Sequence, residues 1–229
     1  MLMVSAFGVK IMAANFTTVT NSTNIITTPC VFGATQSNTT MAWFYLNGLT
    51  PTTYRDIVTI DQQVYHQVLN NAIDYGTFGN DHVSSNLNAN TWYHSVQVNV
   101  PTSTTSRQIY GYLNGELVVN VTDGDTWAAS TLACIGSSPE TGYTLPFNGN
   151  IKDVRIWNRA LNAREILDEM NSRIPIHRAG LFLWVPLDDN LAVDRSGNNN
   201  VLTVGSEVTL QQGPMNTMVF PKKRISFPI

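Results

Sequence analysis

Two carboxylates on one face of a strand are the pattern that could give this sequence catalytic chemistry. Alternate side chains of a strand point to the same face, and retaining glycoside hydrolysis needs two carboxyl groups about 5 Å apart, one as acid and one as nucleophile. The closest pair with alternate spacing is Asp123 and Asp125, which flank Gly124 in a segment typical of a turn. We therefore expect that the protein is not an enzyme.

Acidic residues in turn-rich segments could instead bind calcium, which is the one cofactor we consider. Calcium takes about six to eight oxygen ligands, and one run of Asp and Asn supplies about three or four, so several loops would have to converge. The alternative interpretation is that these residues shape tight turns. The candidate calcium ligands are Asp123, Asp125, Asp188 and Asp194.

Three aromatic residues are candidates for binding a glycan, because an aromatic ring beside amide and hydroxyl groups suits a sugar. Trp127 follows the turn at Asp125, and Tyr110 and Tyr112 face away from the apolar side chains of their own strand-like segment. Aromatic residues of a β-sandwich more often pack in its core, so the alternative interpretation for each of them is structural.

Composition restricts both the class of fold and the partners. Charged residues make up only 13% of the 229 residues, whereas Thr and Asn are abundant, which favours strands and turns. The net charge of −3 provides no cationic surface for a phosphate backbone, so we expect no nucleic-acid partner. No apolar run approaches the roughly 20 residues that cross a bilayer, so we expect no membrane partner.

Cys30 and Cys134 lack metal-ligand spacing and are expected to be two buried thiols, with a disulfide only in an oxidising setting.

Hydrophobic periodicity predicts several short strands and a single helix. Residues 92–100 alternate completely, with Trp92, His94 and three valines on one face, so we expect a core histidine rather than a catalytic base. Asn114-Gly115 supplies the positive φ angles of a hairpin turn between two strand-like runs. Asn162 and Glu165 form a capping box that predicts a helix over 163–170. Further strands are predicted at 41–46, 109–113, 116–121, 151–157 and 181–187.

Many short strands with one short helix predict an all-β protein, a two-sheet antiparallel jelly-roll sandwich. Residues 1–14 are predicted to be an N-terminal arm or first strand, and residues 15–229 a single sandwich. Fewer than 50 residues remain after Leu181, too few for a second domain of this kind, so the strands of 181–229 are expected to complete or extend the sandwich.

Three segments in order resemble the laminin-G-like branch of the concanavalin A-like lectin/glucanase superfamily. They are Trp92-Tyr93-His94-Ser95-Val96-Gln97-Val98, then Tyr112-Leu113-Asn114-Gly115-Glu116-Leu117-Val118, and finally residues 147–161, which join a glycine turn, a strand and the start of the capped helix. With the closing Glu165-Ile166, the resemblance covers roughly residues 40–170 and implies the same two-sheet jelly roll. It also implies calcium as a cofactor to consider, because several relatives bind it on rim loops.

The resemblance does not extend to catalytic residues. Glucanases of the superfamily typically carry Glu-x-Asp-x-x-Glu along one strand. None of the five glutamates of this chain is followed by Asp at the second position. The motif of the resembling hydrolases is therefore missing.

Bacteriophage structural proteins often use the resembling fold, so the resemblance, together with the low content of charged residues, implies three expected functions. We expect a virion protein, a bacteriophage capsid decoration or a tail or fibre component, assembled in the host cytoplasm and displayed on the virion surface. Its partners would be neighbouring virion subunits or further copies of itself, with a cell-surface glycan as an additional partner. The alternatives are a stand-alone carbohydrate-binding module or adhesin, which would be extracellular, and a divergent glycoside hydrolase or lyase.

Overall fold

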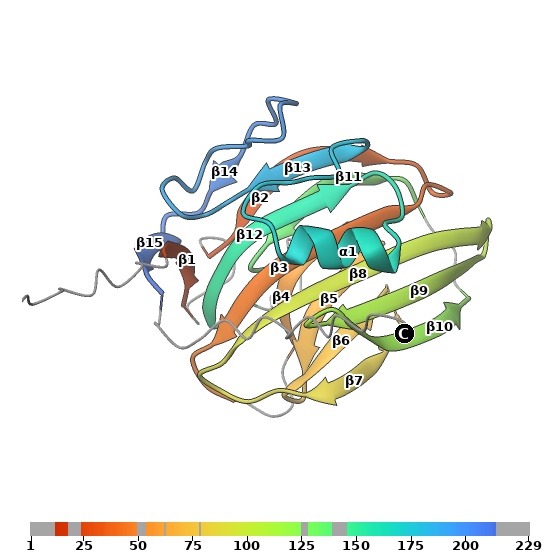
Figure 1. The fold of residues 1–229 in the computed structure, drawn as a ribbon, viewed down its shortest axis with the longest axis horizontal. Coiled ribbons are helices and arrows are strands. Elements are labelled where there is room, and N and C mark those ends of the chain that lie inside the picture. The colour runs from red at the N-terminus through yellow and green to blue at the C-terminus, as the bar shows by residue number, and fades with distance from the viewer. Residues whose placement is uncertain are drawn as a thin grey trace, which may run out of the picture.

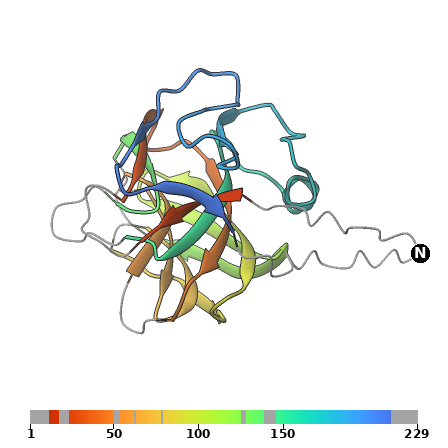
Figure 2. The same cartoon turned by 90° about the vertical axis from the view of Figure 1, so that its left-hand side faces the viewer.

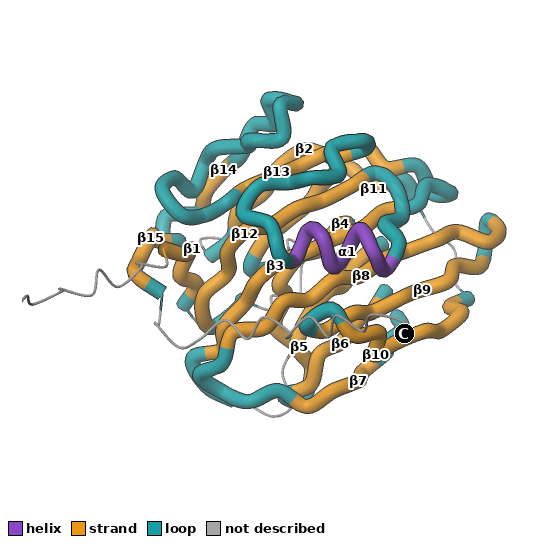
Figure 3. Tube along the Cα trace, in the orientation of Figure 1, coloured by secondary structure: helices purple, strands orange, loops and turns teal. Residues whose placement is uncertain are grey.

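The computed structural model describes the chain in seven segments and shows two antiparallel sheets packed face to face. These segments are residues 12–17, 24–49, 54–61, 63–77, 79–124, 128–138 and 146–213. Strands make up most of the molecule, and the described residues contain one helix, α1 (Ala163–Met170) (Figure 3). The all-β sandwich with a single short helix that the sequence predicts is confirmed.

One sheet, which we call sheet A, has eight strands. In the middle of this sheet, strands that are far apart in the sequence pair with each other, as in a jelly roll. In spatial order they are β10 (Glu116–Asp123), β9 (Ser106–Leu113), β8 (Trp92–Ser103), β3 (Asn38–Leu46), β12 (Gly149–Trp157), β1 (Met12–Phe16) and β15 (Thr209–Gln212), with β13 (Leu181–Val185) pairing with β12 beside β1.

The second sheet, sheet B, has seven strands. In spatial order they are β14 (Thr203–Val204), β2 (Ile26–Phe32), β11 (Ser130–Ile135), β4 (Tyr54–Ile60), β5 (Val64–Leu69), β6 (Ala72–Gly76) and β7 (Val83–Asn86). Figure 1 shows the two sheets stacked with α1 in front of sheet A, and Figure 2 shows α1 end-on, outside the sandwich.

Local sequence explains the best-defined elements. Strand β3 is buried at all nine positions because it lies between β8 and β12 and is covered on both faces, as its apolar sequence predicts. The β9–β10 hairpin turns at Asn114 and Gly115, whose φ angles are 51° and 82°, the positive values of the predicted turn. Helix α1 begins at the predicted capping box, since Asn162 accepts from the Glu165 amide and Glu165 accepts from the Asn162 amide.

The apolar face of strand β8 would be expected to point into the interior of the sandwich, but it points outward. Val96 and Val98 face outward and pack beneath α1, against Ile166 and other residues outside the sandwich. The opposite face, which carries Ser95, Gln97 and Asn99, lies between the sheets and is buried. Neutral polar residues therefore occupy part of the interior, where hydrogen bonds to the facing sheet and within sheet A satisfy most of their polar atoms.

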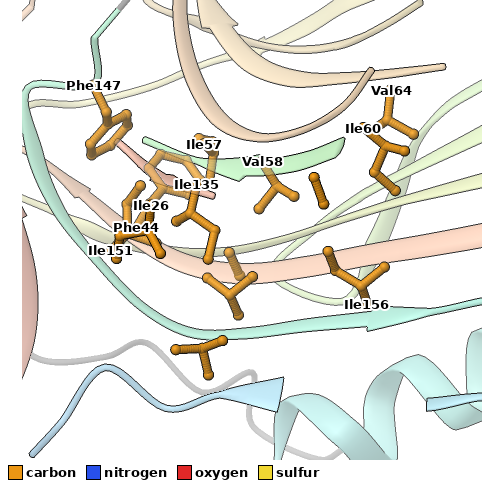
Figure 4. Close-up of a cluster of buried hydrophobic side chains, with 14 of the residues drawn as sticks. Ile26, Phe44, Ile57, Val58, Ile60, Val64, Ile135, Phe147, Ile151 and Ile156 are labelled. Carbon is orange, nitrogen blue, oxygen red and sulfur yellow. The ribbon is translucent and has the colours of Figure 1, made fainter. Parts of the chain in front are cut away.

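An apolar cluster fills the other part of the interior. Isoleucine, valine and phenylalanine side chains from both sheets interdigitate there, as Figure 4 shows. Members contributed by sheet A include Phe44, Ile151 and Ile156, and members contributed by sheet B include Ile26, Val58 and Ile135.

The two ends of the described chain are built into the sheets. β1 pairs with β12 and with β15, while β14 pairs with β2. Residues after Leu181 thus add strands to both sheets of the same sandwich. Cys30 and Cys134 are both buried and free of a disulfide, and burial raises the pKa of each thiol to about 12.

Candidate functional site

The predicted glycan-binding tyrosines lie on the outer face of sheet A, at the side of the sheet beyond α1. Tyr112 is buried against the cluster beneath α1, where it packs with Val96 and Val98. Burial and the neighbouring Tyr110 raise the pKa of Tyr112. Tyr110 only borders this cluster and is half-buried. Of the two, Tyr110 is therefore the residue that a ligand in solution could contact.

Three neutral polar side chains surround Tyr110 on the same face. Asn120 is directly opposite Tyr110 in the β9–β10 register, and Thr122 is directly opposite Gln108. The Thr122 hydroxyl donates to Oε1 of Gln108 at 2.7 Å, and Nε2 of Gln108 donates to Oδ1 of Asn120 at 2.7 Å. We call this set, Gln108, Tyr110, Asn120 and Thr122, the β9–β10 strip.

The β9–β10 strip presents polar groups to solvent without a charge. Its hydrogen bonds fix the orientation of both amides, while Asn120 and Thr122 remain exposed. The charged residues of these two strands nearest to the strip, Arg107 and Asp123, lie on the opposite face and are buried between the sheets. The strip therefore combines an aromatic ring with fixed hydrogen-bonding groups on a neutral surface.

Asp123, a predicted calcium ligand, lies inside the sandwich at the end of β10. Its carboxylate accepts a hydrogen bond from the Thr77 hydroxyl and lies 3.4 Å from Nε2 of His82. Burial lowers the pKa of neighbouring Arg107 to about 10. The Asp123 carboxylate has a smaller effect in the opposite direction. In the structure Asp123 thus links β10 to the end of sheet B.

The other candidate calcium ligands lie elsewhere. Asp188 is exposed, and Asp194 accepts hydrogen bonds from the backbone amides of Trp184, Ser196 and Asn200. These bonds shape the loop beside β13, as the turn interpretation predicts. Four strand spacings, about 19 Å, separate β10 from β12, with which β13 pairs, so one ion cannot bind both Asp123 and Asp194. Asp125 and Trp127 lie outside the described residues.

Sequence reasoning missed two neighbouring carboxyl groups on the outer face of sheet B. Asp74 of β6 is buried, and burial raises its pKa to about 7 with a further contribution from neighbouring Asp81. Nε2 of Gln67 donates to Asp74 Oδ2 at 2.7 Å, and the His82 amide donates to Oδ1 at 2.7 Å. The turn-forming residues between the two aspartates, Gly76, Gly79 and Asn80, are the sequence signal that could have suggested their proximity.

A serine and a histidine also meet inside the sandwich. Nε2 of His66 lies 2.7 Å from Oγ of Ser95, while Nδ1 lies 3.3 Å from the Thr40 hydroxyl. Burial lowers the pKa of His66 to about 3. Both residues are inaccessible to solvent, so this contact connects the two sheets rather than presenting a nucleophile.

Two negative findings concern the described residues only. No three His, Cys, Asp or Glu side chains among them gather closely enough to hold a metal ion. Their helix is too short to reach across a lipid bilayer.

Comparison with known proteins identifies the class of fold. The family model described as the concanavalin A-like lectin/glucanases superfamily matches residues 19–167, more than half of the chain. This protein belongs to that superfamily. No curated protein sequence matches the chain.

Two solved structures share the fold. A putative carbohydrate binding protein from Bacteroides ovatus superposes with a TM-score of 0.63 at 18% identity, over 89% of this chain and 60% of that one. The present chain thus spans about three fifths of that protein. A heptameric SAP-like pentraxin from Limulus polyphemus superposes with a TM-score of 0.60 at 14% identity, over 90% of this chain and 97% of the pentraxin. These similarities show a lectin-like jelly roll.

Proposed function

We propose that this protein binds a carbohydrate at the β9–β10 strip and does not catalyse a reaction on it. The observation that carries the proposal is the half-buried Tyr110 beside the exposed Asn120, which lies directly opposite it across the strand pair. A sugar ring presents an apolar face that can lie against an aromatic ring, while its hydroxyl groups need polar partners. The strip supplies both on one surface.

The hydrogen bonds within the strip support a binding role because they orient the groups before a ligand arrives. Gln108 is held by Thr122 on one side and by Asn120 on the other. Preorganised side chains lose less conformational entropy on binding than free ones. The neutral character of the strip favours an uncharged glycan over an acidic one, because no cationic side chain belongs to it.

Titration calorimetry with neutral oligosaccharides chosen from a glycan array tests this proposal. Tyr110→Ala should weaken binding about tenfold, equivalent to about 1.4 kcal/mol, whereas Tyr110→Phe should retain most of the affinity. Asn120→Ala should weaken binding several-fold. Asn86→Ala is the matched control, because Asn86 is an exposed asparagine on the edge strand of the other sheet. Unchanged affinity in Tyr110→Ala would reject the strip as the site.

Binding without catalysis is part of the proposal. The strip contains no carboxylate to act as acid, base or nucleophile, and retaining glycoside hydrolysis requires two of them. Incubation of the protein with each bound glycan should release no reducing sugar. Release that persists in purified protein and disappears when one carboxylate is replaced would establish a hydrolase instead.

The virion role is a separate proposal about where the binding surface is used. A capsid decoration or fibre component would display such a module at the particle surface, next to other virion subunits or copies of itself. The low content of charged residues, 13%, favours extensive contacts with neighbours. Mass spectrometry of purified particles from the source of the gene would detect the chain in stoichiometric amount, and its absence would leave the free module or adhesin.

A further inference from the structure

The dipeptide Asn-Gly occurs three times in the chain, each time beside a strand of sheet A. The three pairs are Asn47-Gly48 after β3, Asn114-Gly115 between β9 and β10, and Asn148-Gly149 at the start of β12. An asparagine amide is thermally labile, and a following glycine leaves the next backbone nitrogen open because it has no Cβ atom. The three pairs share this chemistry, so the fold decides which of them can react.

Deamidation requires the backbone nitrogen of the glycine to reach Cγ of the asparagine side chain. A bond forms between these two atoms, and the carboxamide C–N bond breaks to release ammonia, which takes up the proton that the backbone nitrogen loses. Water then opens the five-membered imide at either carbonyl carbon and leaves an aspartate or an isoaspartate. The asparagine side chain must therefore be free to turn, and the glycine amide must be free to approach it.

Two of the three pairs are held in ways that oppose this reaction. Oδ1 of Asn114 accepts from the His94 backbone amide at 2.9 Å, and the Asn114 backbone amide donates to the His94 carbonyl at 2.7 Å. Gly149 is buried and pairs with Leu46 on one side and with Phe16 on the other. Neither glycine can approach its asparagine side chain without breaking these contacts.

The pair Asn47-Gly48 is the one that the fold leaves open. Asn47 is exposed, and its side chain has no hydrogen-bond partner within the described part of the chain. The backbone amide of Gly48 likewise donates to no described group, because strand β3 ends at Leu46. A Cβ atom on Gly48 would meet nothing within 4 Å. The attacking nitrogen and the side chain that it attacks are thus both unconstrained by the sheet.

We propose that Asn47 is a site of spontaneous deamidation, and that the fold protects Asn114 and Asn148 from the same reaction. Water is the co-reactant, and the products are aspartate and isoaspartate at position 47. Either product carries a carboxylate, so the chain gains one negative charge at an exposed position after β3. This modification is independent of the β9–β10 strip, which contains none of these residues.

The contact between Gly48 and Arg55 gives the modification a structural consequence. Nη1 of Arg55 donates to the Gly48 carbonyl at 2.9 Å, and Arg55 is only 4% exposed. Isoaspartate adds a methylene group to the backbone before Gly48, which moves this carbonyl away from the guanidinium. A buried donor that loses its acceptor destabilises the fold. Aspartate keeps the normal backbone and should leave the hydrogen bond intact.

Incubation of the purified full chain at mildly alkaline pH, followed by peptide mapping with mass spectrometry, tests the proposal. Asn47 should be modified first, while Asn114 and Asn148 should remain amides over the same interval. Gly48→Ala should slow the reaction about tenfold, because the methyl group shields the attacking nitrogen and has room in the fold. Unchanged kinetics in Gly48→Ala would overturn the proposal.

Gly33→Ala is the matched control, because it also adds a Cβ atom with room around it, the nearest atom being Cβ of Gln36 at 3.9 Å. It should leave the rate at Asn47 unchanged. A second control is the chain unfolded in guanidinium chloride, where Asn47 and Asn114 should react at similar rates because both follow a leucine and precede a glycine. Equal rates at these two positions in the native protein would show that the fold gives no protection.

Thermal melting of the products separated by ion exchange tests the consequence at Arg55. The isoaspartate form should melt about 3 °C or more below the unmodified protein, because it loses the hydrogen bond to Gly48. Asn47→Asp carries the same added charge on a normal backbone and should melt as the wild type does. An isoaspartate form as stable as Asn47→Asp would contradict the displacement of the Gly48 carbonyl.

Discussion

Single residues decide how the two sheets meet. Tyr75 of β6 crosses the interior to donate to the Tyr112 carbonyl at 2.7 Å and to contact Ser95 Oγ at 2.8 Å. The Tyr75 ring passes directly over Gly111 of β9, where a Cβ atom would lie only 2.2 Å from Cδ2 of the ring. Glycine at 111 is therefore required by a contact between the sheets, whereas its own φ angle makes no such demand.

We expect Gly111→Ala to lower the free energy of unfolding by about 1–3 kcal/mol, because the added methyl group displaces Tyr75 and its hydrogen bonds. Urea denaturation followed by tryptophan fluorescence measures the change. Gly124→Ala is the control, since the nearest atom to its Cβ is the Thr105 carbonyl oxygen at 3.9 Å. Equal stabilities of the two variants would contradict the role of the Tyr75 contact.

Buried histidines should make the stability depend on pH. Burial lowers the pKa of His66 to about 3, and burial together with Arg155 and His66 does the same for His94. Between pH 6.5 and about 3 the unfolded chain therefore binds more protons than the folded one. The free energy of unfolding should consequently fall as the pH drops through this range, by about 1.4 kcal/mol per pH unit for each histidine.

His94→Phe isolates one of these contributions. The His94 ring packs 5.0 Å from that of Trp43, and its Nδ1 has no hydrogen-bond partner within the described residues, so an aromatic replacement keeps the packing. The variant should lose about half of the pH slope and be more stable than the wild type at pH 5. An unchanged slope in urea denaturation at pH 7, 6 and 5 would contradict this assignment.

At the scale of elements, a buried arginine attaches α1 to sheet A. Arg155 of β12 forms two hydrogen bonds with Asp153, at 2.9 Å and 2.7 Å. It also donates to the carboxylate of Glu169 of α1 at 2.5 Å and to the carbonyl oxygen of the same residue at 3.1 Å. Oε1 of Glu169 accepts the amides of Ile176 and His177 in the segment after the helix. The helix, the strand and the following loop are thus joined by one charged network beneath the surface.

We expect Glu169→Ala to cost about 3–5 kcal/mol of unfolding free energy, because the buried Arg155 guanidinium loses one of its two carboxylate partners and the amides of Ile176 and His177 lose their acceptor. Arg164→Ala is the control on the same helix, as it removes an exposed pair with Asp168 and should cost about 0.5 kcal/mol or less. Chemical denaturation of the two variants and of Arg155→Met/Glu169→Leu provides the comparison. The double variant should recover part of the loss, and a double variant less stable than Glu169→Ala would contradict the argument.

At the scale of the whole molecule, the interior is divided between apolar packing and a hydrogen-bonded layer. Asn99 donates to Asn38 at 3.1 Å within sheet A, while Nε2 of Gln97 donates to the Gly76 carbonyl of sheet B at 2.9 Å. Polar pairs of this kind tolerate few alternative registers, because a shift would leave buried groups unsatisfied. The edge strands β7 of sheet B and β10 of sheet A also contact each other, since the Ser84 hydroxyl of β7 donates to the Val118 carbonyl of β10.

Strands from both ends of the described chain complete the sheets, so we expect one cooperative unfolding transition. Far-ultraviolet circular dichroism and tryptophan fluorescence should give coincident denaturation curves, because β1 and β13 cannot separate without exposing the same core. The five tryptophans include Trp92 and Trp157, both buried, so fluorescence reports on the packed structure. Two separated transitions would show that the C-terminal strands form an independent unit.

Features that depend on residues close together in the chain could be predicted before the structure was known. Alternation identified β8 and β12, Asn114-Gly115 identified the hairpin, and the Asn162 box identified the helix, because each signal acts over a few residues of backbone. The sandwich fold followed from these elements and from the resemblance of residues 92–161. Tyr110 could likewise be proposed as a ligand-binding residue, because its side chain faces the other way from that of the adjacent Ile109.

The interior face of each strand, by contrast, depends on how the two sheets pack. Period-two alternation defines two faces but does not say which one the second sheet covers, and in β8 the polar face is the one enclosed. For the same reason the pairing of Asn120 with Tyr110 and the proximity of Asp74 to Asp81 were not readable from the chain. Such contacts depend on register and on turn geometry, which arise when distant strands pair and bury their common core.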